Sequence, residues 1–192
     1  QINTDLKTFS IKFTEKSTTR LGERDDGGNL TKESIKRVLE TLGRFKEYCL
    51  SYGVEKILAA ATSAVRESPN GKDLIMSIKE IIGFEIELIS GAEEARLIYL
   101  GVLSGMALDN KSHLILDIGG GSTEIILADS EDTRALTSTS VGAVRLKNDF
   151  FDEAPLTNSR IEFIKTFIQG SLEPSIGKIN RRIDKNKPIS LI

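Results

Sequence analysis

The sequence of 192 residues contains very few of the side chains that build disulfides and transition-metal sites. It has one cysteine, Cys49, and one histidine, His113. A single cysteine excludes an intrachain disulfide, and the two residues together are too few for a zinc site of cysteine and histidine ligands. A hard cation needs only oxygen ligands. Any metal bound by this chain is therefore expected to be held by aspartate and glutamate.

A large excess of charge and long apolar runs are also absent. The 26 basic and 28 acidic residues leave a formal net charge of −2, so the sequence gives no reason to expect nucleic acid as a partner. No apolar run approaches the ~20 residues of a membrane span, and we expect no membrane partner. With 39% hydrophobic and 28% charged residues, the composition is that of a globular protein. We expect a reduced, cytoplasmic location.

The first half of the sequence alternates between helix and strand patterns. The apolar periodicity predicts helices over about 31–52, 73–82 and 90–103, and strands over about 54–61 and 84–88. An earlier strand signal lies at Phe9, Ile11 and Phe13. Thr31 is expected to cap the first helix, and Gly53 to follow its end. Strands and helices in this order indicate a layered α/β fold.

The second half of the sequence is dominated by strands. Strands are predicted over 113–118, 123–128 and 134–140, and the short turns between them favour a meander of hairpins over a βαβ unit. A helix over about 158–170 and a strand beginning at Pro188 follow. We expect the domain boundary at the change near Asn110, with a first domain over 1–110 and a second over 111–192.

Residues 117–124, DIGGGSTE, form the most informative segment. It lacks the lysine of a Walker loop, and a strand pattern follows where a dinucleotide-binding fingerprint needs a helix. The remaining interpretation is a glycine turn between two strands. Successive backbone N–H groups in such a turn can point into one concavity and cradle phosphate, and three glycines in a row exceed what a tight turn requires. The expected phosphate-binding residues are Gly119, Gly120, Gly121 and Ser122.

Two acidic residues, Asp117 and Glu124, flank this turn. They would repel a phosphate group unless a cation lay between them. The pattern therefore predicts either Mg²⁺ that bridges carboxylate and phosphate oxygens, or acids that orient a water molecule.

Two further segments contain candidate residues. Glu93 and Glu94 fall in the first turn of the helix over 90–103, where the helix dipole favours acids whatever the function. If one of them faced the glycine turn, it could act as a general base on water, and the spacing does not tell which one. Arg66 follows small and hydroxyl residues at the end of the 54–61 strand. It would suit an oxyanion contact, although a surface position also explains it.

Four segments in the same order resemble the exopolyphosphatase/guanosine-pentaphosphatase family of the actin-like ATPase superfamily. They are ATSAVRES at 61–68, SGAEEARLIYLGV at 90–102, DIGGGSTE at 117–124 and VGAVRL at 141–146. The glycine turn is similar to the second phosphate-binding hairpin of the superfamily. The resemblance implies an α/β, actin-like (ribonuclease H-like) two-domain fold, present here in incomplete form.

The resemblance also implies an activity and residue roles. Members of the family hydrolyse phosphoanhydride bonds with Mg²⁺, releasing terminal phosphate from polyphosphate or the 5′-phosphate of guanosine pentaphosphate. Carried over, Glu94 would activate water with help from Glu124, and Asp117 and Glu124 would hold the metal. Arg66 and the turn from Gly119 to Ser122 would contact phosphate oxygens. A homodimer is a family-level expectation.

The sequence departs from the family pattern at both ends. The family begins with a strand and a first glycine-containing phosphate loop, which have no counterpart here, and a further glycine-rich turn is expected beyond Ile192. We therefore expect a truncated chain with little activity in isolation. A nucleotide- or alarmone-binding regulator without catalysis and a small-molecule kinase of the same superfamily are the alternatives. The retained acids argue against a pure binder, which gains nothing from a base beside an anionic ligand.

Overall fold

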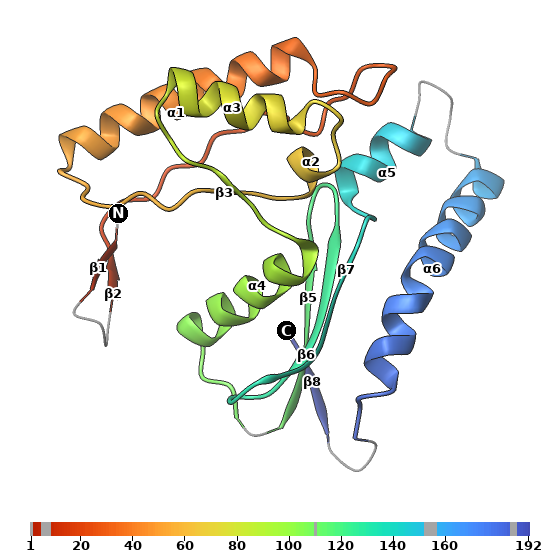
Figure 1. Ribbon diagram of the computed structural model, residues 1–192. Coiled ribbons are helices and arrows are strands. Elements are labelled where there is room, and N and C mark those ends of the chain that lie inside the picture. Colours follow the sequence, from red (N-terminus) through yellow and green to blue (C-terminus); the bar gives the residue numbers. More distant parts are fainter. Residues whose placement is uncertain (1, 5–8, 110, 152–156, 185–187) are drawn as a thin grey trace. The chain divides into compact units, whose positions relative to one another are not determined.

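The computed structural model describes residues 2–4, 9–109, 111–151, 157–184 and 188–192. The chain divides into two compact units, the first formed by Gln1–Ala61 and Glu67–Leu88 and the second by Thr62–Arg66 and Ile89–Ile192 (Figure 1). Both units combine helices with strands. Within the described residues, no helix is both long and apolar enough to cross a membrane.

In its described residues, the first unit combines two helices with two pairs of short strands. Strand β1 (Ile2–Thr4) pairs antiparallel with β2 (Phe9–Ile11), and β3 (Ala60–Ala61) pairs parallel with β4 (Glu87–Leu88). The helices are α1 (Lys32–Ser51) and α3 (Gly71–Ile81), so both helices predicted for this part are confirmed.

The predicted start of α1 is also confirmed. Oγ1 of Thr31 accepts a hydrogen bond of 3.1 Å from the N–H of Ser34, which satisfies one of the donors left open at a helix start. After α1 the chain turns at Gly53, whose φ of 59° is in the left-handed region, where glycine avoids the steric penalty of a side chain.

The strand predicted over 54–61 is much shorter than expected. Only Ala60 and Ala61 pair with a neighbour, and Ile57 and Leu58 are exposed. A strand requires a hydrogen-bonded partner, and among the described residues only β4 supplies one. An apolar run alone therefore overestimated the length of this strand.

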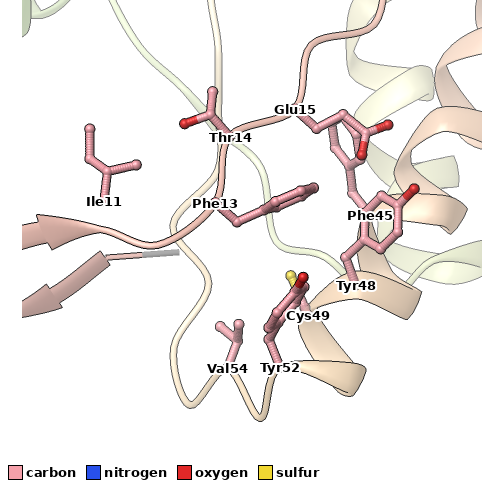
Figure 2. A pocket seen from close by; sticks show the side chains of 9 residues that line it. All are labelled: Ile11, Phe13, Thr14, Glu15, Phe45, Tyr48, Cys49, Tyr52 and Val54. Atoms are coloured by element: carbon pink, nitrogen blue, oxygen red, sulfur yellow. The ribbon is translucent and has the colours of Figure 1, made fainter.

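A pocket of about 400 Å³ lies in the first unit, and Figure 2 shows the side chains that line it. Aromatic rings form part of its wall: the ring of Phe13 stacks on Tyr52 and meets Tyr48 edge to face, with both centroid distances 5.6 Å. Glu15 and Cys49 also line the pocket, but the predicted site residues are not among the described residues that do. The pocket therefore belongs to the packing of α1 and the segment after β2.

The second unit is built around a four-stranded sheet with the order β7-β6-β5-β8. Strands β5 (Ser112–Ile118), β6 (Thr123–Ala128) and β7 (Thr133–Thr139) form the predicted antiparallel meander, and β8 (Ile189–Leu191) pairs parallel with β5. The helices of this unit are α2 (Ser63–Arg66), α4 (Gly91–Gly105), α5 (Ala143–Phe150) and α6 (Asn158–Asn180).

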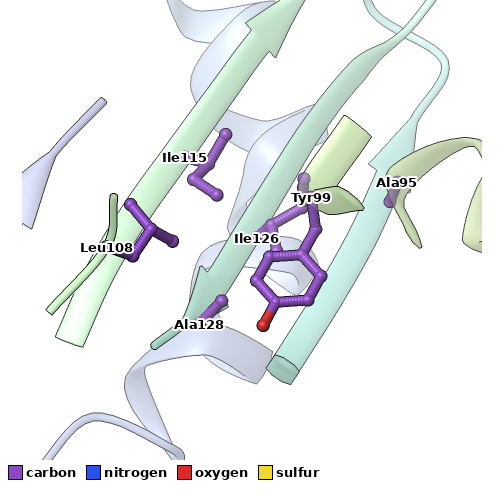
Figure 3. Packing of buried hydrophobic residues seen from close by; sticks show 6 residues of the cluster. All are labelled: Ala95, Tyr99, Leu108, Ile115, Ile126 and Ala128. Carbon is purple, nitrogen blue, oxygen red and sulfur yellow. The ribbon is translucent and has the colours of Figure 1, made fainter. Parts of the chain in front are cut away.

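Helices α4 and α6 cover opposite faces of this sheet. Figure 3 shows Ala95 and Tyr99 of α4 packed with Ile115, Ile126 and Ala128. The other face buries a second cluster of Ile125, Leu127, Ala135 and Ile179, the last from α6. Residues of β6 alternate between the two clusters, as the period of a strand requires. Both faces of β6 are therefore buried.

Helix α5 was not predicted from the sequence, and the predicted α6 was too short. Helix α6 was expected to end near Gly170, but it continues to Asn180 with Pro174 inside it. Glycine and proline each weaken a helix interior, by about 1 and 3 kcal/mol. The buried side chains of Ile164 and Ile179 explain the continuation, because packing against the sheet outweighs local propensity.

The boundaries between the two compact units differ from the domain boundary expected near Asn110. Asn110 itself lies outside the described residues. Helix α4 packs against β6 and β7, so it joins the second unit although it precedes residue 110, and the short segment Thr62–Arg66 does the same. As a result, every predicted site residue lies within the second unit.

Candidate active site

A row of polar side chains crosses the sheet beside the glycine turn. Asp117 of β5 lies opposite Glu124 of β6, and Glu124 lies opposite Ser138 of β7. Ile115 lies two residues before Asp117 on β5, and Ile126 lies two residues after Glu124 on β6. Both pack against α4. Because side chains alternate along a strand, the row also faces α4. Cβ atoms of directly opposed residues lie about 4.5–5.5 Å apart, so Asp117 and Glu124 form one carboxylate pair.

The glycine turn between β5 and β6 directs its carbonyl groups toward the start of α5. The first three N–H groups of α5 donate to the carbonyl oxygens of Gly119 and Gly120 at 2.9–3.0 Å, and Nε of Arg145 donates to that of Gly121 at 3.1 Å. The N–H that follows a carbonyl across a trans peptide points the opposite way. The N–H groups of Gly120, Gly121 and Ser122 therefore point away from α5, as a phosphate cradle requires.

Two glycines at this turn are required by close packing. A Cβ on Gly121 would overlap Oγ of Ser63, the buried first residue of α2. A Cβ on Gly142, which caps α5, would lie 2.5 Å from the carbonyl oxygen of Gly120 and 2.6 Å from the N atom of Gly121. The turn is thus held between α2 and the start of α5.

The two acidic residues in the first turn of α4 bond to different arginines. Glu93 bonds to Arg96 on the surface, at 2.6 and 2.8 Å, and these hydrogen bonds lower the pKa of Glu93. Glu94 instead accepts a hydrogen bond of 3.2 Å from Nη1 of Arg66, with both side chains largely buried. Of the two acids, Glu94 is therefore the one that faces the interior of the second unit.

Arg66 holds the start of α4 from the side of α2. Its Nη1 donates both to Glu94 and, at 2.9 Å, to the carbonyl oxygen of Ile89. A guanidinium also has donors on Nη2 and Nε. The Arg66 side chain therefore orients Glu94 and has further donors for an anionic oxygen.

Glu124 is a carboxyl group in an unfavourable environment for charge. The residue is only 2% exposed, and this burial raises its pKa. Hydrogen bonds from Ser138 and Ser122 oppose the shift, whereas the negative charges of Glu94 and Asp117 add to it, and the pKa remains raised overall. A positive charge near this group would relieve the repulsion among the three acids.

The donor chemistry at this place fits Mg²⁺ bound by few protein ligands. Among the described residues, the structure has no group of three or more Asp, Glu, His or Cys side chains arranged to enclose a metal. Mg²⁺ commonly uses one or two carboxylates and completes its shell with water and substrate phosphates. The opposed pair Asp117 and Glu124 meets that requirement.

The structure adds residues that sequence reasoning did not select. Ser138 donates a hydrogen bond of 2.7 Å to Oε1 of Glu124 and lies close to Gly91, whereas Gly142 and Ser63 pack closely against the glycine turn. Ser138 could have been found by pairing the strand predicted over 134–140 with that over 123–128 in register. The contacts of Gly91 and Ser63 join segments far apart in the sequence, and no local pattern indicates them.

The fold is that of an actin-like α/β protein, as expected from the resemblance. The crystal structure of an exopolyphosphatase from Cytophaga hutchinsonii superposes with a TM-score of 0.87 at 30% identity, covering 94% of this chain and 58% of that one. A Ppx/GppA family member from Aquifex aeolicus gives a TM-score of 0.71 at 26% identity, covering 91% of this chain and 57% of that one. The predicted fold class is confirmed.

The chain belongs to the Ppx/GppA phosphatase family, whose sequence pattern matches residues 2–191. Exopolyphosphatase 1 of Mycobacterium tuberculosis is 31% identical over 163 residues, which are 84% of this chain and 47% of that protein. The guanosine-5′-triphosphate,3′-diphosphate pyrophosphatase of Photobacterium profundum is 31% identical over 147 residues, which are 77% of this chain and 29% of that protein. The chain thus spans about half the length, or less, of the curated relatives it matches.

Proposed function

We propose that the protein carrying this chain hydrolyses phosphoanhydride bonds, releasing terminal phosphate from polyphosphate or the 5′-phosphate of guanosine pentaphosphate. The observation that supports this most strongly is the gathering of three acids beside the glycine turn: the charges of Glu94 and Asp117 both act on buried Glu124. Relatives named for each of the two activities support the same reaction class.

In the proposed reaction, the glycine turn binds the terminal phosphate through the N–H groups of Gly120, Gly121 and Ser122. Glu94 accepts a proton from a water molecule as that water attacks the terminal phosphorus and the phosphoanhydride bond breaks, so that the shortened substrate leaves as its phosphate. Arg66 keeps the Glu94 carboxylate oriented through its hydrogen bond. Such hydrolysis depends chiefly on positioning and on charge neutralisation. Arg66 would also contact phosphate oxygens through its remaining donors.

Asp117 and Glu124 are the residues proposed to hold Mg²⁺. The ion would supply positive charge that neutralises the phosphate oxygens and offsets the repulsion among the acids. Ser138 and Ser122 would keep the Glu124 carboxylate turned toward that position. A cytoplasmic location and a homodimer remain expectations of this proposal.

The test is orthophosphate release in the presence of Mg²⁺ by the protein at its natural length, with long-chain polyphosphate and guanosine pentaphosphate as separate substrates. Glu94→Gln should lower kcat by about 10²–10⁴-fold, the usual contribution of a general base. Glu93→Gln is the matched control, because Glu93 bonds to Arg96 on the surface, and it should stay near wild type.

The two substrates and the two variants give different answers. The ratio of the rates on polyphosphate and guanosine pentaphosphate identifies the preferred substrate. A folded wild type that releases phosphate from neither would refute the hydrolase and favour a binding protein. Equal losses in both variants would refute the assignment of Glu94 as the base.

A further inference from the structure

We propose that Ser138 is a positioning residue that holds Glu124 by its hydroxyl group and the first turn of α4 by its Cβ, and so sets the relative placement of Glu124 and Glu94. This inference rests on the proposed hydrolase function. Ser138 is not a catalytic residue in this proposal, because it acts through the two carboxylates.

The hydroxyl group of Ser138 bonds directly to the buried carboxylate of Glu124. Its Oγ lies 2.7 Å from Oε1 of Glu124, and the two residues are directly opposed in the pairing of β6 with β7. An ionised carboxylate only accepts hydrogen bonds, so the hydroxyl is the donor. A carboxylate that is 2% exposed requires such a donor, since an unpaired buried charge is very costly. Removing the hydroxyl should therefore let the carboxylate rotate or move.

The Cβ of Ser138 meets the backbone of α4. A Cβ on Gly91, the first residue of α4, would lie 2.6 Å from both Cβ and Oγ of Ser138, and 3.7 Å from Nη2 of Arg66. These short separations mean that the backbone at the start of α4 packs directly against the Ser138 side chain. Because Glu94 is in that same first turn and bonds to Arg66, the contact at Gly91 determines where Glu94 lies.

Neighbouring hydroxyl groups on β7 make bonds of a different kind. Thr137 donates to the backbone carbonyl of Ile125 at 3.1 Å, and Thr139 bonds to Ser175 of α6 at 2.7 Å. By the alternation of the strand, Thr137 lies on the opposite face from Ser138. It is a buried residue whose comparable hydrogen bond goes to a backbone carbonyl and not to a carboxylate, which makes it a suitable control.

Two substitutions disturb the contacts of Ser138 in different ways. Ser138→Ala removes only the hydroxyl and keeps the Cβ that supports α4. Gly91→Ala keeps every group of Ser138 but places a Cβ against both its Cβ and its Oγ, so it displaces the helix start and the hydroxyl together. Thr137→Val and Gly101→Ala are the matched controls, because Gly101 lies in α4 with no atom within 4 Å of an added Cβ.

The measurement is the separate kcat and KM for phosphate release by the protein at its natural length. We expect Ser138→Ala and Gly91→Ala to lower kcat by about 10–100-fold, as for other residues that orient a reacting group, with KM within about threefold of wild type. The controls should leave both constants within about threefold. If Ser138 only stabilised the fold, Ser138→Ala and Thr137→Val would lower the amount of active enzyme to a similar degree. The rates of both variants should therefore be normalised to the concentration of folded protein.

The outcomes distinguish this inference from the proposed function. Phosphate release by wild type, with Ser138→Ala indistinguishable from Thr137→Val, overturns the role of Ser138 and leaves the hydrolase in place. A rise in KM with unchanged kcat also overturns it, because positioning of the reacting groups should appear in kcat. No release by folded wild type overturns the hydrolase and this inference together.

Discussion

Replacing Gly142 with alanine should disturb the glycine turn without adding or removing any charge. The residue has extended backbone, with φ −150° and ψ 164°, so alanine can adopt its conformation. The added Cβ, however, would lie 2.5–2.6 Å from backbone atoms of Gly120 and Gly121. Carbon contacts are optimal at about 3.5–4.0 Å, so backbone atoms would have to separate by roughly 1 Å.

This displacement sets the expected magnitude. Adding a methyl group to a closely packed place typically costs about 1–3 kcal/mol, and the obstructing atoms are backbone that cannot rotate away. For a chain of this size each kcal/mol lowers Tm by roughly 2–4 °C. We therefore expect Tm of the Gly142→Ala chain to fall by roughly 2–12 °C, as measured by thermal unfolding followed by circular dichroism.

Two further variants test the steric reasoning. Alanine is also a poor helix cap, so Gly142→Ser is needed: serine caps well and introduces the same Cβ. If the clash is the cause, the serine chain should be destabilised as well. Gly101→Ala, in an open and exposed helical position, should raise stability by about 0.5–1 kcal/mol. A Gly142→Ser chain as stable as wild type would refute the clash.

Two other predictions concern acidic residues of the second unit. Asp129 accepts hydrogen bonds from the N–H of Glu131 and from Arg134, which lower its pKa to about 2 from 3.8; Asp129→Asn should therefore lower the free energy of unfolding by about 1–2 kcal/mol at pH 7. This stabilising contribution of Asp129 is fully present above the pKa of the unfolded state, near 4, and is lost as pH falls toward 2. Urea unfolding at pH 7 and near pH 2 should therefore show a smaller difference in the free energy of unfolding between wild type and Asp129→Asn at the lower pH. A difference that does not change with pH would contradict this prediction. The pKa of Glu124 is raised by burial, so ionisation of Glu124 disfavours folding as pH rises above its pKa in the unfolded state. Glu124→Gln should therefore leave the free energy of unfolding at pH 7 equal or higher. The same substitution should abolish phosphate release. A large loss of stability in Glu124→Gln would contradict the assigned cost of this buried charge.

Several features of this protein were determined by sequence alone because they depend on local interactions. The three antiparallel strands of the second unit follow from alternation and turn residues, and the cap at Thr31 follows from one side chain and its nearby backbone. The identity of the glycine turn with its flanking acids, Asp117 and Glu124, is likewise local. Strand pairing across a tight turn then places those two acids opposite each other.

Other features were decided only by tertiary structure. The helix dipole alone left Glu93 and Glu94 equivalent and only the family resemblance pointed to Glu94, whereas the contact with Arg66, 28 residues away in the chain, distinguishes them physically. Helix α6 passes Pro174 because packing on the sheet outweighs helix propensity, and the strand over 54–61 is short because pairing requires a neighbour. The position of Gly91 against Ser138 likewise depends on how α4 docks on the sheet. These outcomes depend on contacts between distant segments, whose energies are absent from any local pattern.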